Sequence, residues 1–203
     1  MLPQLGFAAA DVEAILGLKR FRHHQIKDAK GRVDWIVSRT GYTGEDGFEF
    51  YVPLDETVGL WEKLIAANIT PAGLGARDVL RIEAGLPLYG HELGEDISAL
   101  DAGLGRFVEL DRDFQGQAMA TNQKTKVIAL ISQSKAIPRE HYRFFAAGEP
   151  AGVVASGTFS PTLGKGIATV FVDKDFVVEG KELALEIRNK LQPFTLTESP
   201  FVK

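Results

Sequence analysis

The residues best equipped to do chemistry lie in one glycine-rich stretch, Ser38 to Glu49 (SRTGYTGEDGFE). Its three glycines mark a tight loop, which exposes backbone N–H groups and lets a planar ligand approach closely. Tyr42 offers a ring that can pack against such a ligand and a hydroxyl that can hydrogen-bond. Glu49 opens the following strand, where its carboxylate can accept two hydrogen bonds from an amino-pyrimidine edge. A purely structural hairpin loop is the alternative, and the spacings of phosphate-binding loops do not occur here.

A second cluster, Gly73 to Gly85, places two arginines on a predicted helix opened by glycines. Arg77 and Arg81 stand four residues apart and therefore share a helix face. Two guanidinium groups on one face can hold a carboxylate by paired hydrogen bonds. The alternative is a pair of surface arginines that form ion pairs with Asp78 or Glu83.

Other kinds of site find little support in the sequence. The chain has no cysteine, which excludes disulfides, thiolate metal sites and a thiol nucleophile. No Gly-x-Ser-x-Gly elbow occurs, so a serine hydrolase is unsupported. No metal site is predicted, because none of the four histidines stands at metal-ligand spacing from another ligand: His23, His24, His91 and His141. No catalytic residue is assigned.

Composition narrows the choice of partners and location. The net charge of −4 gives no overall positive field that would recruit nucleic acid or anionic lipid, so neither is expected as a partner. No apolar run approaches the roughly 20 residues that span a bilayer, so no membrane segment is predicted. The start, Met1 to Phe7, lacks a basic region followed by an apolar core and does not resemble a secretory signal. A cytoplasmic protein is expected.

The first half of the chain alternates predicted strands and helices, which indicates an α+β fold. Asp11 is a candidate N-cap for the first helix, and Gly85 is a suitable residue to end the last one. The turn at Asp28 to Gly31 joins two predicted strands into a hairpin. The predicted elements are a helix over 11–18, strands over 21–27, 33–38 and 48–52, and helices over 55–67 and 77–84.

After about Asp113 the pattern changes to short strands separated by turn signals, which is typical of a small β-barrel or sandwich. A short helix over 117–121 precedes them. The boundary between the two portions is expected near residues 112–125, which gives domains of 1–115 and 116–203. The clearest strands are predicted over 126–131, 151–155, 166–172 and 182–187.

The two clusters, in this order and spacing, resemble the glycine cleavage T-protein (aminomethyltransferase) family. Arg39 to Glu49 is similar to that family's most recognisable segment, and Gly75 to Glu92 resembles the next one. The resemblance covers nearly the whole chain. It continues through residues 105–108, 113–116, 157–168 and 200–202.

The resemblance implies an activity, a folate substrate and a partner. Family members transfer an aminomethyl group from the lipoyl arm of a carrier protein to tetrahydrofolate, and ammonia and methylenetetrahydrofolate are formed. Carried over by motif, Tyr42 would pack near the folate, Glu49 would hydrogen-bond the pterin and Arg77 would contact the ligand.

The chain also departs from the family. Members are typically much longer, and their first portion includes an aspartate proposed to activate the folate nitrogen, which no segment here resembles. The expected fold is an incomplete α+β folate-binding portion followed by a C-terminal β-barrel. The chain is expected to belong to an enzyme family but to be inactive by itself. Exposed apolar surface and a homo-oligomer that covers it are expected as well.

Two other readings within the same fold stay open. One is a non-catalytic folate-binding or regulatory module, such as relatives that serve iron–sulfur assembly, although those show a cysteine-containing motif and this chain has no cysteine. The other is a sister methyltransferase or demethylase acting on a methylated substrate. The complete segment from Arg39 to Glu49 favours the glycine cleavage branch over the latter.

Overall fold

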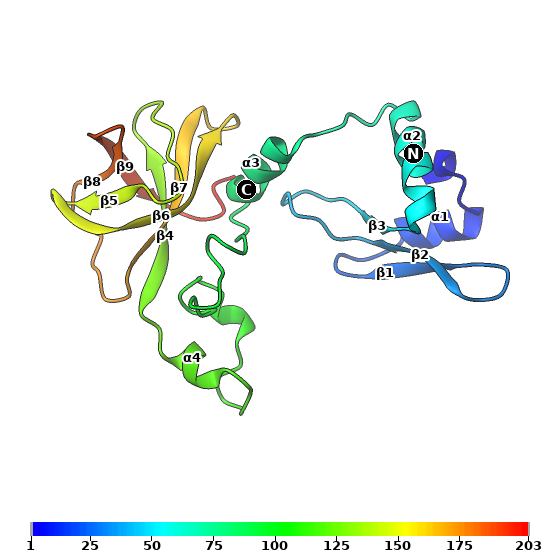
Figure 1. The fold of residues 1–203 in the computed structure, drawn as a ribbon, viewed down its shortest axis with the longest axis horizontal. Coiled ribbons are helices and arrows are strands. Elements are labelled where there is room, and N and C mark those ends of the chain that lie inside the picture. The colour runs from blue at the N-terminus through cyan, green and yellow to red at the C-terminus, as the bar shows by residue number, and fades with distance from the viewer. Residues whose placement is uncertain (1, 203) are drawn as a thin grey trace. The chain divides into compact units, whose positions relative to one another are not determined.

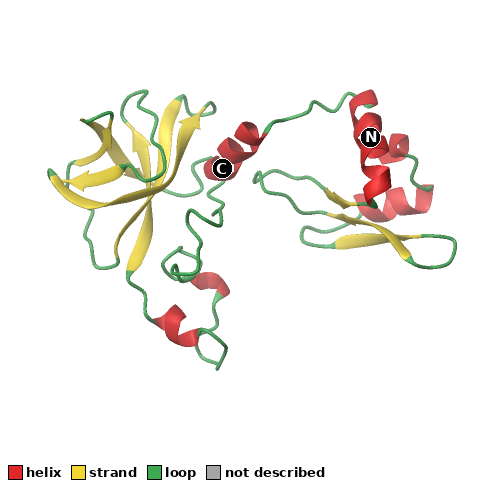
Figure 2. Ribbon diagram, in the orientation of Figure 1, coloured by secondary structure: helices red, strands yellow, loops and turns green. Residues whose placement is uncertain are grey.

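A computed structural model describes residues 2–202, which form two compact units (Figure 1). The first unit ends at Arg77 and the second begins at Asp78, inside helix α3 (Leu74–Glu83). Figure 2 shows that helices and a small sheet make up the first unit, whereas strands dominate the second. Along residues 2–202, no helix is both long enough and apolar enough to span a bilayer.

The first unit is built on a three-stranded antiparallel sheet in the order β1-β2-β3. The predicted hairpin is confirmed, because Trp35 and Val37 alternate toward the core on β2 and pair with Ile26 and His24 on β1. The side chain of Asp28 accepts the N–H groups of Lys30 and Arg32 and so fixes the turn. The elements are β1 (His23–Lys27), β2 (Val33–Ser38), β3 (Glu49–Tyr51), α1 (Ala9–Leu16), α2 (Thr57–Ala66), and 3-10 helices at Leu2–Leu5 and Leu54–Glu56.

The core of this unit forms where the helices cover the sheet. The ring of Phe7 meets that of Trp35 edge-on, with 5.2 Å between centroids, and stacks on Phe50 at 6.4 Å. Such aromatic contacts add to the stabilisation from buried area. The buried apolar residues are Leu5, Ile15, Trp35, Val37 and Leu60.

The first helix begins differently from the prediction. Asp11 was expected at its N-cap, but α1 starts at Ala9 and its cap residue, Ala8, makes no side-chain cap. Asp11 lies inside the helix, and its Oδ1 atom is 2.8 Å from Nε2 of His24 on β1. The N-cap prediction is therefore wrong, because the carboxylate contacts His24 on a neighbouring strand and not the N–H groups at the start of the helix.

Helix α2 has an apolar side that the unit does not cover. Leu60 is buried against the core, whereas Val58 and Trp61 are 67% and 56% exposed. Leu54 and Ile65 extend the exposed stripe at helical spacing. The first unit thus carries exposed apolar surface of the kind expected from the sequence.

The second unit is dominated by a closed antiparallel barrel, which confirms the predicted barrel and the α+β class. Helix α4 (Gln117–Thr121) precedes it, after a loop-rich stretch with a 3-10 helix at Gly105–Phe107. Strands β5 and β9 were not predicted. In barrel order the strands are β4 (Thr125–Ser132), β7 (Lys165–Asp173), β6 (Glu149–Ser160), β5 (Arg143–Ala146), β8 (Leu183–Ile187) and β9 (Lys190–Thr197).

The barrel is filled by alternating apolar side chains from all its strands. Phe144 and Leu185 are fully buried on strands that pair with each other. At 25 cal/mol per Å² or so of apolar area, this filling is the main stabilising contribution in the unit. The buried core comprises Leu130, Phe144, Ala146, Val154, Ala168, Val170, Val172, Val178, Leu183, Leu185 and Phe194.

Candidate functional site

The glycine-rich loop between β2 and β3 is held at its base by an ion pair. Arg39 donates to both carboxylate oxygens of Asp46, at 2.9 and 2.7 Å, and its third contact is the carbonyl of Leu18 at 2.6 Å. The hydrogen bond from Arg39 lowers the pKa of Asp46. Gly44 takes a φ of +79°, which a residue with a Cβ adopts at a cost. The loop is therefore a defined structure.

Glu49 stands at the first position of β3, opposite Ser38 in the sheet register. Its Oε2 accepts the hydroxyl of Thr40, and that hydroxyl lies 2.8 Å from Oγ of Ser38. Glu49 itself is exposed, whereas Ser38 is buried. A carboxylate that is oriented by one hydroxyl and is otherwise exposed to solvent is able to accept hydrogen bonds from a ligand.

The structure places all three predicted site residues, Tyr42, Glu49 and Arg77, in the first unit. The guanidinium of Arg77 lies 4.6 Å from the centroid of the Tyr42 ring, a cation–π contact. Tyr42 is half-buried and Arg77 is exposed. Their assignment as folate contacts stays a prediction.

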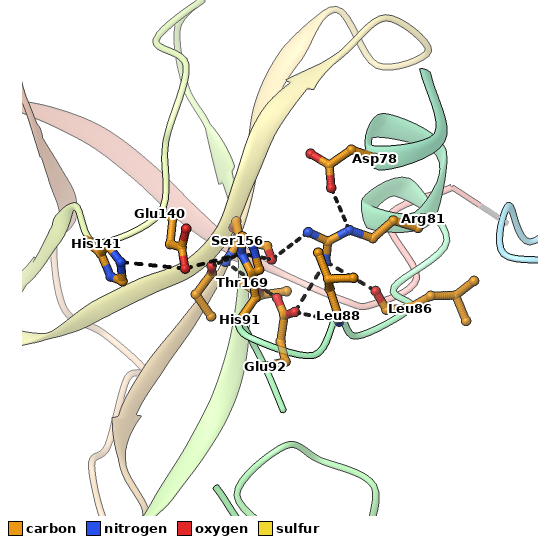
Figure 3. Close-up of polar contacts among 11 residues, drawn as sticks. Asp78, Arg81, Leu86, Leu88, His91, Glu92, Glu140, His141, Ser156 and Thr169 are labelled. Atoms are coloured by element: carbon orange, nitrogen blue, oxygen red, sulfur yellow. Dashed lines mark hydrogen bonds and ion pairs between the residues drawn. The ribbon is translucent and has the colours of Figure 1, made fainter. Parts of the chain in front are cut away.

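The alternative reading of the arginine pair holds only in part for Arg81. Arg81 forms the ion pair with Asp78 that this reading allowed, but it is only 1% exposed, so it is not a surface residue. Its Nε donates to Asp78 at 2.9 Å, its Nη1 to Glu92 at 3.2 Å and its Nη2 to Ser156 at 2.9 Å (Figure 3). A buried guanidinium whose donors are used in this way has a structural role in this arrangement.

Glu92 is the buried partner of Arg81 and is 3% exposed. It accepts the hydroxyl of Thr169 on β7 and the backbone N–H of Leu88 at 3.1 Å. Nδ1 of His91, the preceding residue, lies 3.0 Å from the carbonyl oxygen of Ala155 on β6. We refer to Arg81, Glu92, Ser156 and Thr169 as the buried network. It fastens the C-terminal part of α3 and the segment after it to the barrel.

A further buried carboxylate closes the end of α3. Glu83 accepts the hydroxyls of Ser160 and Thr162 in the β6–β7 hairpin. Its own carbonyl accepts the N–H groups of Phe201 and Val202 from the C-terminal segment. Among the described residues, no buried side-chain nitrogen or oxygen is left without a hydrogen-bond partner.

Asp101 is a third buried carboxylate, and it was not singled out from the sequence. It accepts the hydroxyl of Ser98, the N–H of Lys124 at 2.9 Å, and both the N–H and the hydroxyl of Thr125. Burial alone would raise the pKa of Asp101, but the hydrogen bonds outweigh it and lower the pKa to about 2. The carboxylate ties the loop-rich stretch to the start of β4.

The buried network borders a cavity of about 350 Å³ that lies wholly within the second unit. Arg81, Glu92 and Thr169 contribute polar atoms to its wall, and Arg106 also lines it. Within residues 2–202, no cluster of three or more histidine, aspartate or glutamate side chains could hold a metal ion.

Comparison with known proteins gives these features a family context. Residues 8–112 match the model of the GCVT N-terminal domain, and residues 124–203 match that of the glycine cleavage T-protein C-terminal barrel domain. The chain is 46% identical over 182 residues to an aminomethyltransferase of Geobacillus thermodenitrificans, covering 84% of this chain and 50% of that protein. An Aquifex aeolicus aminomethyltransferase is 47% identical over 170 residues, with 83% and 48% covered.

A solved structure agrees with this result. The crystal structure of the glycine cleavage system aminomethyltransferase T from Bartonella henselae superposes with a TM-score of 0.84 at 30% identity, covering 99% of this chain and 56% of that one. The chain spans about half the length of the curated relatives it matches. The chain, matched along nearly all its length by the two family models, belongs to the glycine cleavage T-protein family.

Proposed function

We propose that this chain provides a folate-binding part of a glycine cleavage aminomethyltransferase. The reaction moves an aminomethyl group from the lipoyl arm of a carrier protein to tetrahydrofolate, with release of ammonia and formation of methylenetetrahydrofolate. Family membership and the names of the relatives support the reaction class. Residues 1–115 contribute the folate contacts and residues 116–203 form the barrel domain.

The observation that carries the proposal is the oriented, exposed carboxylate of Glu49. Thr40 donates to one of its oxygens, so the carboxylate is positioned before any ligand arrives. A pterin presents amide and amino N–H groups along one edge, and a carboxylate is the side chain best suited to accept two of them. The edge of the ligand and the charge of Glu49 are thus complementary.

Tyr42 and Arg77 extend the same site toward a flat ligand. A planar ring system packs well against a tyrosine ring, and the arginine fork can donate to an acceptor or carboxylate of the ligand. Their mutual contact at 4.6 Å keeps both groups in one place. Tetrahydrofolate supplies the nitrogen that accepts the one-carbon unit. These three residues hold the folate, and no residue of the chain is assigned to the transfer step.

Calorimetric titration of the purified chain with tetrahydrofolate tests the proposal. We expect saturable binding that Glu49→Gln weakens by about 1–3 kcal/mol, or roughly 5- to 150-fold, because a ligand donor then loses its charged acceptor. Glu45→Gln is the matched control, since Glu45 is an exposed carboxylate in the same loop. No binding by the folded wild-type chain, or equal losses in both variants, would overturn the assignment.

The transfer step has its own assay. The wild-type chain mixed with tetrahydrofolate and an aminomethylated lipoyl carrier protein is expected to release no ammonia by itself, because no catalytic group is assigned to it. Ammonia release at a rate proportional to the concentration of this chain would show that its own residues complete the reaction.

Self-association is also part of the proposal. The exposed stripe is formed by Leu54, in the 3-10 helix before α2, and by Val58, Trp61 and Ile65 of α2. It gives a second copy of the chain an apolar surface to cover. We expect light scattering to show a mass that rises with concentration, and Trp61→Glu to lower that mass. A concentration-independent monomer would contradict self-association and leave the folate site unaffected.

A further inference from the structure

The second unit carries a groove of about 570 Å³, a size typical of small-molecule sites. Two segments line it, the loop at 134–139 and the β8–β9 turn at 187–192, together with Tyr142. All of them belong to the second unit. We refer to this feature as the cationic groove because its lining contains four basic side chains: Lys135, Arg139, Arg188 and Lys190.

The first wall of the groove is held rigidly against the barrel. Pro138 is buried, and it packs where a Cβ on Gly157 would meet it at 2.9 Å. A Cβ on Gly166 would lie 2.0 Å from the carbonyl oxygen of Ala136. Both glycines therefore allow a close backbone approach that any side chain would prevent. Lys135 and Arg139 flank this anchored stretch.

The second wall is a tight hairpin turn with an unusual residue in it. Arg188 and Asn189 have φ values of +54° and +60°, the left-handed conformation of a two-residue hairpin. Asparagine and glycine adopt this conformation readily, but arginine adopts it only at a cost. A basic side chain is thus presented at a position where turn chemistry alone favours asparagine or glycine.

The four basic groups lack acidic partners. Within residues 2–202, none of them forms an ion pair, and no carboxylate lines the groove. The carboxylates next to them in sequence are directed elsewhere. Glu140 lies 3.5 Å from His91 and 3.6 Å from His141, and Glu186 lies 3.4 Å from Arg143.

This concentration of positive charge contrasts with the chain as a whole, whose net charge is −4. Four cations around one concave surface repel each other, and a bound anion would relieve that repulsion. Arginine forks bind phosphate oxygens in pairs, and lysines add point charges. The ring of Tyr142 and the side chains of Ile137 and Ile187 supply an apolar floor beside the charges.

We propose that the cationic groove is a binding site for a small polyphosphate ligand, separate from the folate contacts of the first unit. The phosphates contact the four basic groups. The apolar floor accommodates a nucleoside or other organic part when the ligand has one. The site requires no chemical step and does not depend on the proposed transferase activity.

Calorimetric titration of the wild-type chain with inorganic triphosphate tests this proposal directly. A double variant, Arg139→Gln with Arg188→Asn, removes two of the cations while it places in the turn a residue that favours left-handed φ. Lys174→Gln is the matched control. Lys174 is an exposed cation that directly follows the last residue of β7, whereas Gly166, which contacts the first wall of the groove, lies near the first residue of that strand. Thermal melts confirm that each variant is folded.

We expect saturable binding of triphosphate that the double variant weakens by at least about tenfold and that Lys174→Gln leaves unchanged. Binding should weaken with added salt, as for any charge-dominated contact. If a nucleoside triphosphate binds more tightly than inorganic triphosphate, the apolar floor is part of the site. If the two bind with equal affinity, the contacts to the phosphates alone account for binding.

Three results would overturn the proposal. One is the absence of saturable heat with either triphosphate, and another is an equal loss in the double variant and in Lys174→Gln, which would indicate nonspecific attraction. The third is equal affinity for triphosphate and for citrate, a tricarboxylate, which would show that the groove does not select phosphate. None of these results bears on tetrahydrofolate binding, so failure here is distinguishable from failure of the proposed function.

Discussion

Glu49 in the first unit and Glu92 in the second both accept a threonine hydroxyl, yet their surroundings are opposite. Glu92 is 3% exposed, and it also accepts hydrogen bonds from the guanidinium of Arg81 and from the backbone N–H of Leu88. Glu49 is exposed, and its threonine contact orients it without enclosing it. A buried carboxylate whose hydrogen-bond partners all come from its own chain stabilises the fold by linking the segments that carry those partners. A carboxylate oriented on one side and open on the other is suited to a ligand.

The two arginines of α3 show the same contrast within a single helix. Arg77 and Arg81 are one turn apart and were indistinguishable from sequence spacing. Arg77 is exposed, with its guanidinium over an aromatic ring, whereas Arg81 is 1% exposed and donates to three side chains. The comparison predicts that substitutions in the buried network cost mainly stability, and that substitutions in the glycine loop cost mainly binding.

The largest effect is expected from Arg81→Met. The variant leaves Glu92 buried without its charged partner, which typically costs 3–5 kcal/mol or so of unfolding free energy. Urea unfolding followed by far-UV circular dichroism measures this loss. Tryptophan fluorescence follows the first unit separately, because Trp35 and Trp61 both lie there.

A double variant sharpens the same experiment. Arg81→Met with Glu92→Gln removes both charges, so it should recover part of the stability lost in the single variant. If Arg81→Met proved no more destabilising than Arg77→Met, the contrast between the buried network and the exposed site would be wrong.

Local sequence patterns were sufficient for most of the elements. The alternation around Trp35 and Val37 predicted β2 with its observed bounds, and residues 117–121 predicted α4. Strand β5 was missed because its four residues give no lasting alternation, and its bulge-containing pairing with β6 is visible only in the structure. Strand β9 was missed because Pro193 interrupts it, and proline within a run argues against a strand.

The candidate site was predictable only where its residues are close in the sequence. Tyr42 lies in the glycine-rich loop and Glu49 begins the strand directly after it, so the pattern of glycines identified both. Ser156 and Thr169 reach the buried network from positions 75 and 77 residues away from their partners, Arg81 and Glu92. No local pattern specifies such a contact, since it depends on how the barrel closes.

The next effect is a difference between two aspartates whose pKa values are both lowered. Asp101 is buried and its pKa is about 2, whereas Asp46 is exposed and its pKa is lowered first by the hydrogen bond from Arg39. We expect added salt to raise the pKa of Asp46 toward its usual value and to leave that of Asp101 nearly unchanged. Carboxyl NMR titrations at two salt concentrations measure both. Equal salt responses would contradict the difference in burial.

The low pKa of Asp101 also has a consequence for stability. Because its folded pKa is below the ordinary value of 3.8, ionised Asp101 stabilises the fold above about pH 4. That contribution, about 2 kcal/mol, is lost as the pH falls from about 4 to about 2. Asp101→Asn should therefore flatten the acid limb of the stability curve. If stability falls as steeply with decreasing pH in the variant as in the wild type, other carboxylates cause the loss of stability at low pH.

The smallest effect on stability is expected from Arg77→Gln, and this variant separates the two regions most sharply. An exposed cation–π contact is worth about 0.5–1 kcal/mol, so unfolding should change by no more than that. Tetrahydrofolate binding should nevertheless weaken by about tenfold, because the ligand loses a charged donor. Arg77→Lys keeps the positive charge but not the forked guanidinium, so its affinity for tetrahydrofolate should lie between those of the wild type and Arg77→Gln. A variant that bound folate as the wild type does would place Arg77, like Arg81, outside the ligand contacts and leave Glu49 and Tyr42 to carry the site.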